Sequence, residues 1–347
     1  MLNGNITLFR QFNFLVTFLL AFILAWRVLD ETIRHLTNSD PRLFIVAASL
    51  ATSSALLAVF AGNWLAIPSY NSLTFQGLLI MSIGLLLATQ GLTKQSIFGW
   101  VLIGLGGFFV FMGKPTTAAI LCFLVPLYLA FAGKFRLNLL LISLSVSMIA
   151  LVISSYAIDG GIVNFYFRYK GGLETGSLFQ SKSIFRWDNL ALNLFALQSI
   201  LITAGLTFIG ITCLTISNKQ FKKISTIISL ILVIPCYFFY YNYFPPASAG
   251  PLREGLLFFS VPAGFFIAII FIAKKNILAL DRSSIALVFL FIALPYSYAF
   301  GTGNDYWVLI SSAGFFIVLA SQVPLKVLDS TGQRNRLGKT FCRCLIV

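Results

Sequence analysis

Long apolar stretches separated by short polar breaks recur along the whole chain. Most approach the ~20 residues with which a helix crosses a bilayer, and none shows the alternation over about ten residues that is typical of membrane β-strands. In lipid, backbone polar groups must bond within their own segment, which favours helices. The pattern therefore predicts an all-α, polytopic transmembrane helical bundle of about eleven spans, near residues 11–27, 43–61, 72–90, 96–113, 116–133, 137–158, 191–216, 224–243, 256–273, 283–299 and 307–322.

Composition places nearly the whole chain in this bundle. Hydrophobic residues make up 59% of the chain and charged residues 10%, whereas about a quarter of a soluble protein is charged. We expect a single transmembrane domain over residues 1–323, with a long outer loop at 159–190. Residues 324–347 are expected to form a basic cytoplasmic tail.

Lysine and arginine residues predict the orientation of the spans. When the C-terminus is placed in the cytoplasm, most of the 24 Lys and Arg residues fall on the cytoplasmic side, as the positive-inside rule requires. The net charge of +14 then faces anionic lipid and gives no reason to expect nucleic acid as a partner. We expect an integral membrane protein with membrane lipid as a partner.

This orientation gathers the unusual connections on the outer face. They are GNWLAIPSYNSL (62–73), GKPTT (113–117), the loop 159–190, FPPASAGPLREG (244–255) and FGTGNDYW (300–307). The inner connections, such as NKQFKK (218–223), are plain basic turns. A functional site is therefore expected on the outer side.

Lys114 lies between two apolar runs and has two interpretations. A lysine at a span end can extend its ammonium to the interface without any ligand, and Pro115 suits the first turn of the next helix. Alternatively, Thr116 and Thr117 supply free N–H groups at a helix N-terminus, which together with the ammonium form a site for an anion. A phosphate group fits this second interpretation.

Three segments carry a resemblance to a known family: PSYNSL before an apolar span, GLGGFFVFMGKPTTAAIL, and LPYSYAFGTGNDYW. They resemble polytopic bacterial membrane proteins of the GT-C glycosyltransferase superfamily, the relatives of protein mannosyltransferases and aminoarabinose transferases. The resemblance covers residues 60–120 and 290–320. It implies a GT-C-like bundle in the bacterial cytoplasmic (inner) membrane that uses a polyprenyl-phosphate-linked sugar as donor, with its functional face outside. On these motifs and the outer loops we expect the substrate-binding residues Tyr70, Asn71, Lys114, Thr116, Arg168, Lys170, Arg253 and Asn304.

The beginning of the chain departs from the family pattern. Members have a cytoplasmic N-terminus, a first span, and then a large outer loop with the acidic residue that acts as base. Here the charge rule places the N-terminus outside, and MLNGNITLFRQ contains no carboxylate. Asp30 and Glu31 do not replace the base, because the same rule places them in the cytoplasm. We expect the chain to lack the first span and first acidic loop and to be catalytically incomplete, unless an upstream-encoded segment joins it as a partner.

The remaining outer carboxylates leave the catalytic base unassigned. Inverting glycosyl transfer needs a carboxylate that takes a proton from the acceptor hydroxyl. Glu254 and Asp305 are weak candidates, because an ion pair with Arg253 explains the first and a turn after GTGN explains the second. No metal and no cofactor are expected, since His35 has no neighbouring ligands and a divalent ion at the phosphate has no support in the sequence.

The outer loop 159–190 mixes aromatic residues with Arg168, Lys170, Lys182 and Arg186. Aromatic faces and cations suit a saccharide and a pyrophosphate, but anchoring at the membrane interface explains the same residues. Three functions stay open: a glycosyltransferase of the hexosyltransferase type, an O-antigen or polysaccharide polymerase or ligase in which Arg168 and Arg186 hold pyrophosphate, and a noncatalytic transporter or subunit. Transporters carry ionisable groups deep within spans, and this chain has few.

Overall fold

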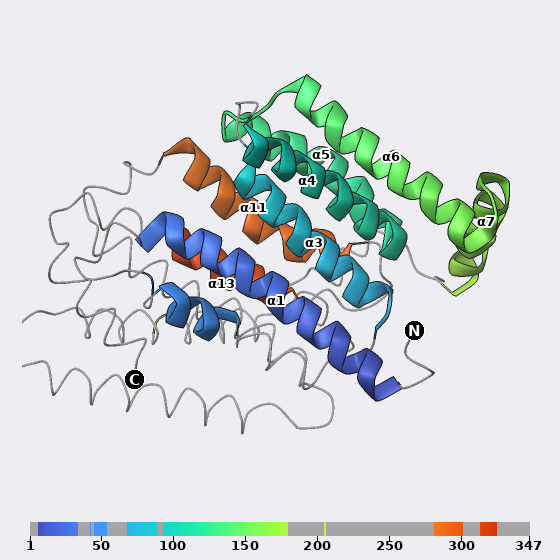
Figure 1. Ribbon diagram of the computed structural model, residues 1–347, viewed down its shortest axis with the longest axis horizontal. Helices are drawn as coiled ribbons and strands as arrows, with labels where there is room; N and C mark the ends of the chain where they lie inside the picture. The colour runs from blue at the N-terminus through green and yellow to red at the C-terminus, as the bar shows by residue number, and fades with distance from the viewer. Residues whose placement is uncertain are drawn as a thin grey trace, which may run out of the picture. The chain divides into compact units, whose positions relative to one another are not determined.

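Helices dominate the part of the chain that the structure describes (Figure 1). The computed structural model describes residues 6–33, 42, 45–53, 68–88, 93–179, 205, 281–300 and 313–324, and these contain no strand. The all-α prediction is confirmed for these residues. The helices are α1 (Ile6–Ile33), α3 (Tyr70–Leu87), α4 (Lys94–Gly113), α5 (Pro115–Phe131), α6 (Leu137–Asp159), α7 (Ile162–Phe179), α11 (Arg282–Ala299) and α13 (Gly314–Gln322), and residues 45–53 are also helical.

The long apolar helices establish the class of protein. Five described helices, α1, α3, α4, α6 and α11, are long and apolar enough to cross a membrane, and α5 is a shorter apolar helix. The chain is therefore an integral membrane protein built of helical spans. The total number of spans stays a prediction, because the spans expected at 191–216, 224–243 and 256–273, and parts of those at 43–61 and 307–322, lie outside the described residues.

The chain divides into two compact units. Unit 1 comprises residues 1–20, 64–191 and 297–306, and unit 2 comprises residues 21–63, 192–296 and 307–347. In unit 2 the rings of Phe291 and Phe316 lie 6.0 Å apart, and the Gln322 side-chain amide donates to the Thr52 hydroxyl at 2.8 Å. The residues that carry the family resemblance and that the structure describes belong largely to unit 1.

Local sequence signals set the ends of the helices in unit 1. The Thr93 hydroxyl accepts a hydrogen bond from the N–H of Ser96 at 3.1 Å and caps the start of α4. Pro115 occupies the first turn of α5, where its missing N–H leaves no bond unmade. Gly133 and Gly160 follow α5 and α6 with φ of 67° and 72°, a left-handed conformation that favours glycine. The chain thus reverses direction between α4, α5 and α6 (Figure 1).

α3 and α4 pack with their backbones almost in contact, because glycines line their facing sides. A Cβ on Gly106 would lie 2.6 Å from the Met81 nitrogen and 2.7 Å from the Gly77 oxygen. A Cβ on Gly84 would lie 2.6 Å from the Gly99 oxygen. Small residues allow membrane helices to approach closely and to associate by van der Waals contact. Since α5 and α6 also pack against α4, the α3–α4 pair is the centre of unit 1.

A polar cluster joins α1 to α3 within unit 1. The Gln76 side-chain amide donates to Asn13 Oδ1 and to the Thr17 hydroxyl, both at 2.9 Å. We expect Gln76→Leu to lower the free energy of unfolding by about 0.6 kcal/mol, the average for a hydrogen bond between membrane helices. Thermal unfolding in detergent measures the change. The control is Gln95→Leu at an exposed position of α4, and a larger loss in the control than in Gln76→Leu would contradict the prediction.

The segment expected as a long loop contains a helix. Residues Ile162–Phe179 form α7, which begins shortly after the end of α6. The expectation of an outer connection between spans stays a prediction, but residues Ile162–Phe179 within it are helical. Gly171 and Gly172 lower the helix propensity in the middle of the segment, and its polar residues remove the signal of a span. α7 is not among the described helices that are apolar enough to cross a membrane.

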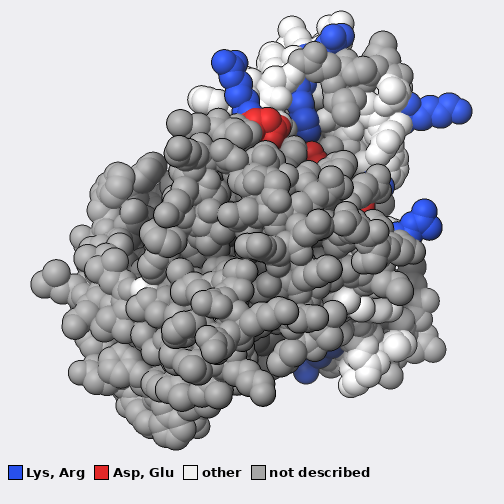
Figure 2. All heavy atoms as spheres, turned by 90° about the vertical axis from the view of Figure 1, so that its left-hand side faces the viewer, with Lys and Arg blue, Asp and Glu red and all other residues white. Residues whose placement is uncertain are grey.

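Basic side chains mark the end of unit 1 where α3 and α5 end and where α4 and α6 begin. Figure 2 views the molecule from this side and shows Lys and Arg side chains among the described residues, with Asp and Glu side chains beside some of them. Lys94 at the start of α4 and Arg136 before α6 are both exposed. Exposed basic side chains also lie toward the opposite end, where Arg168 and Lys170 belong to α7. Tyr70, Lys114 and Asp159 lie at the ends of α3, α4 and α6 that point the other way (Figure 1).

Candidate functional site

Lys114 is buried at the junction between α4 and α5. It stands outside both helices, between Gly113 and Pro115, and only 4% of its surface is exposed. Its Nζ donates to the Tyr298 carbonyl at 3.2 Å and lies 4.0 Å from the centroid of the Tyr298 ring and 5.7 Å from that of Tyr70. The negative faces of aromatic rings attract an ammonium. Residues from α3 and α11 thus surround the charge.

Lys114 and Thr116 together satisfy the C-terminal end of α11. The last carbonyls of a helix have no partner within it, and the helix dipole makes this end negative. The Lys114 ammonium donates to the carbonyl of Tyr298, and the Thr116 hydroxyl donates to that of Phe300 at 3.1 Å. Two residues predicted to bind substrate therefore also hold the end of α11 in place.

Burial and protein partners act in opposite directions on the charge of Lys114. Burial removes water from the ammonium and lowers its pKa to about 7. The Tyr298 carbonyl and the two tyrosine rings favour the charged form. Among the described residues, no carboxylate pairs with Lys114. An anion at this junction would therefore stabilise a cation that the described residues hold without a counterion.

The first turn of α3 completes the site. The Tyr298 hydroxyl donates to the Asn71 carbonyl at 3.3 Å, and the rings of Tyr298 and Phe75 meet edge to face with centroids 6.3 Å apart. Asn71 Oδ1 and the Thr117 hydroxyl are buried and have no hydrogen-bond partner among the described residues. Buried oxygens without partners are rare, so these two are the polar atoms at the junction that are most available to a further group.

The structure brings together three segments that lie far apart in the chain and that each carry part of the family resemblance. The start of α3 is separated from the α4–α5 junction by two helix lengths, and the end of α11 follows much later in the sequence. Helix packing places their ends side by side. The residues that meet are Tyr70 and Asn71 of the first segment, Lys114 and Thr116 of the second, and Tyr298 and Phe300 of the third.

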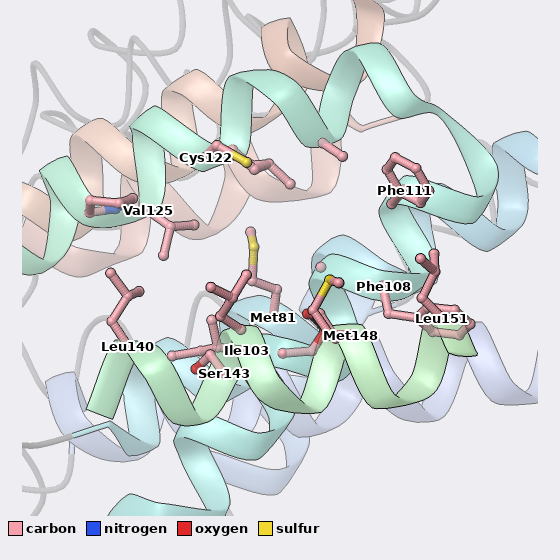
Figure 3. Close-up of a pocket in the computed structure, with 17 residues that line it drawn as sticks. Met81, Ile103, Phe108, Phe111, Cys122, Val125, Leu140, Ser143, Met148 and Leu151 are labelled. Atoms are coloured by element: carbon pink, nitrogen blue, oxygen red, sulfur yellow. Dashed lines mark hydrogen bonds between the residues drawn. The ribbon is translucent and has the colours of Figure 1, made fainter. Parts of the chain in front are cut away.

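An apolar cavity of about 400 Å³ lies between α5 and α6, with α4 as its floor (Figure 3). Figure 3 shows Phe111 at one end of the cavity and Leu140 at the other. The Ser143 and Ser147 hydroxyls donate to carbonyls of α4, each at 2.6 Å, so their protons are directed away from the cavity. Phe111 lies within one helical turn of Lys114. The cavity therefore offers a place for an apolar chain, and one of its lining residues lies three positions before Lys114 in the sequence.

The predicted binding residues Arg168 and Lys170 lie on α7 and have acidic partners of their own. Arg168 donates to both oxygens of Asp159, with Nε–Oδ1 at 2.6 Å and Nη2–Oδ2 at 3.0 Å, and this pair raises the pKa of the guanidinium. The Lys170 ammonium lies 3.9 Å from a carboxylate oxygen of Glu174. A pyrophosphate would have to compete with Asp159 for Arg168. The structure does not bring either residue to Lys114.

The remaining predicted residues are not located by the structure. Arg253, Asn304 and both weak candidates for the catalytic base, Glu254 and Asp305, lie outside the described residues. Within the described residues no group of His, Cys, Asp or Glu side chains could hold a metal ion. The site that can be built is therefore a binding site around Lys114, without a base.

The sequence interpretation missed Tyr298, which contributes a carbonyl, a ring face and a hydroxyl to the site. A tyrosine close to the end of an apolar span reads as an ordinary interfacial anchor. Comparisons of the chain with protein-family models, with curated proteins and with solved structures find no match. The class that fold and site define is an integral membrane protein of helical spans with a buried lysine at one end of unit 1.

Proposed function

We propose that the chain is a membrane glycosyltransferase of the GT-C kind, which binds a polyprenyl-phosphate-linked sugar at the outer face of the bacterial cytoplasmic membrane. The phosphate lies beside Lys114, and the isoprenoid chain runs into the cavity between α5 and α6. A sugar acceptor reaches the site from the outer side, at the end of unit 1 opposite Lys94 and Arg136.

The observation that carries this proposal is the meeting of the three resembling segments around one lysine. Sequence likeness between short motifs has little weight on its own. It gains weight here because Lys114 interacts with both Tyr70 and Tyr298, although packing alone did not require these segments to be neighbours. The convergence of three resembling segments at one site supports the family assignment more strongly than any single segment does.

Two further observations support the chemistry of the ligand. Lys114 has no carboxylate partner among the described residues, and a buried cation favours an anionic ligand. The cavity between α5 and α6 is apolar, as the tail of a polyprenyl phosphate requires. The polymerase or ligase alternative relies on Arg168 and Arg186 as pyrophosphate ligands. Of these, Arg168 is already paired with Asp159, and Arg186 lies outside the described residues.

A pH titration of ligand binding tests the proposal. The sugar donor is a phosphodiester and keeps its charge near neutral pH, whereas burial lowers the pKa of Lys114 to about 7. A bound phosphate raises that pKa, so above pH 7 the complex must take up a proton. The affinity of the full chain in nanodiscs for a polyprenyl-phosphate hexose should therefore fall by about tenfold or more between pH 7 and pH 9.

Two controls separate charge from hydrophobic binding. A polyprenol without phosphate should bind with an affinity that does not change with pH. Lys134→Met should bind the donor as the wild type does, because Lys134 donates to the Leu85 carbonyl at 3.4 Å at the opposite end of α5. A donor affinity that is independent of pH, or no stronger than that of the polyprenol, would overturn the proposal. Transfer of sugar to an acceptor is measured separately, since no base is assigned.

A further inference from the structure

α6 is long enough to cross a membrane and ends where α7 begins. Its 23 residues extend over about 35 Å, slightly more than the ~30 Å of a hydrocarbon core. Arg136 precedes the helix and Asp159 is its last residue, so both ends are polar. Gly160 terminates it in a left-handed conformation, and α7 starts at Ile162. The first turn of α7 is therefore placed at the boundary between hydrocarbon and headgroups.

One side of α7 is held against the rest of unit 1. The ring of Tyr169 stacks on that of Phe111 in α4, with centroids 5.7 Å apart. On an adjacent side of the helix, Arg168 holds the carboxylate of Asp159, and the Asn164 side-chain amide donates to the Asp159 carbonyl at 2.9 Å. These contacts join α7 to the ends of α4 and α6. They fix which side of α7 is turned away from the protein.

The side turned away carries an apolar stripe. Ile162, Val163, Tyr166 and Phe167 are 51%, 67%, 58% and 64% exposed. Residues three or four positions apart are neighbours on a helix surface, so Tyr166 lies beside Ile162 and Val163, and Phe167 lies beside Val163. The stripe stops at Lys170, which approaches Glu174. The exposed apolar residues of α6 continue toward it, and they include Leu144, Ile149, Ile153, Tyr156 and Ile158.

The charges of α7 do not call for an anionic partner. Arg168 is neutralised by Asp159, and Lys170 lies close to Glu174. What remains on the exposed side is aliphatic and aromatic surface. Exposing this surface to water costs a free energy of roughly 25 cal/mol for each Å². Tyrosine is typical of the interface, where the ring lies among acyl carbons and the hydroxyl reaches the headgroups.

We propose that α7 is an interfacial helix that lies along the membrane surface, with Val163, Tyr166 and Phe167 inserted among the lipid headgroups and the first acyl carbons. The partner is the lipid surface itself, reached as a continuation of the lipid-facing side of α6. This surface is separate from Lys114, and its role does not depend on the proposed function. Its contact is apolar, so the insertion is independent of anionic lipid and of salt.

Depth-dependent quenching tests the proposal on the full chain. The five cysteines are replaced by alanine, one cysteine is introduced at a time, and an NBD fluorophore on it is quenched by spin-labelled lipids in phosphatidylcholine vesicles. Labels at Val163→Cys and Phe167→Cys should lie about 5–10 Å into the boundary region. A label at Ile149→Cys, exposed near the middle of α6, gives the depth of the hydrocarbon centre. A label at Asn164→Cys, on the side of Asp159, should be quenched from water by iodide.

Each other outcome overturns the proposal. If iodide quenches the labels at Val163, Asn164 and Phe167 equally, α7 projects into water. If neither lipid nor iodide reaches Val163 and Phe167, another part of this chain or a second protein covers the stripe. If insertion appears only with anionic lipid and disappears in salt, charge and not apolar burial holds the helix. A further variant tests whether the fluorophore itself drives insertion. Phe167→Ser, combined with the fluorophore at Val163→Cys, should place that fluorophore at a shallower depth, because the insertion depends on Phe167.

Discussion

Gly106→Ala should separate α3 from α4 and lower the free energy of unfolding by roughly 3 kcal/mol, the upper part of the usual range for overpacking. The new methyl group would lie 2.6 Å from the Met81 nitrogen and 2.7 Å from the Gly77 oxygen. Both atoms belong to the backbone of α3, so no side chain can rotate out of the way. α3 must therefore move away from α4 as a whole, and the close packing between these two helices is lost.

The next residue provides a matched control. A Cβ on Gly107 would meet only the Ser147 hydroxyl, at 3.6 Å, an ordinary van der Waals distance. Gly107→Ala should therefore be neutral or slightly stabilising, because alanine favours a helix by about 1 kcal/mol over glycine. Thermal unfolding in detergent, followed by the loss of the monodisperse peak in size-exclusion chromatography, compares the two. Equal melting temperatures for the neighbouring variants would refute the close α3–α4 contact.

Lys114→Ala should destabilise the protein by roughly 2–4 kcal/mol and loosen the end of α11. The substitution removes the donor to the Tyr298 carbonyl, which costs about 1–3 kcal/mol for a buried group, and it removes an ammonium from the faces of two rings. Hydrogen exchange locates the effect. The amides near the end of α11 should exchange faster, while those in the middle of α4 keep their protection.

Two variants show whether the effect belongs to this contact. Thr116→Val keeps the volume but loses the hydroxyl that donates to Phe300, and it should cost about 1 kcal/mol with the same local change in exchange. Lys134→Ala removes a half-buried lysine with a longer bond to Leu85 and should cost less than Lys114→Ala. If both lysine variants lose the same stability, Lys114 has no special part in holding α11.

The candidate site could be predicted only in part. GKPTT singled out Lys114 because a charge between apolar runs is conspicuous. The sequence left two interpretations of it, and neither included its role at the C-terminus of α11, which depends on a residue far along the chain. Arg168 was read as a ligand for pyrophosphate because nothing in a linear sequence shows that Asp159 comes within hydrogen-bond distance of it. A sequence does not show which charged side chains form ion pairs in the folded protein.

Glycine spacing is a signal that the sequence contains and that could have located the α3–α4 contact. Gly77 and Gly84, and Gly99, Gly106 and Gly113, recur at every seventh residue. A seven-residue repeat keeps side chains on one face of a helix, and small residues on one face favour a close helix pair. The pattern indicates a partner, but it does not say which helix the partner is.

The sequence by itself determined that this is a helical membrane protein and where most of the described helices lie. Lipid offers the backbone no hydrogen bonds, so any apolar stretch of sufficient length must become a helix whatever surrounds it. Only the tertiary structure decided which helices are neighbours, which carbonyl Lys114 holds, and that Ile162–Phe179 is a helix. Lipid solvates every apolar helix face equally well, so it does not favour one neighbour over another. The choice of neighbour depends on complementary shape at close range and on hydrogen bonds between residues far apart in sequence.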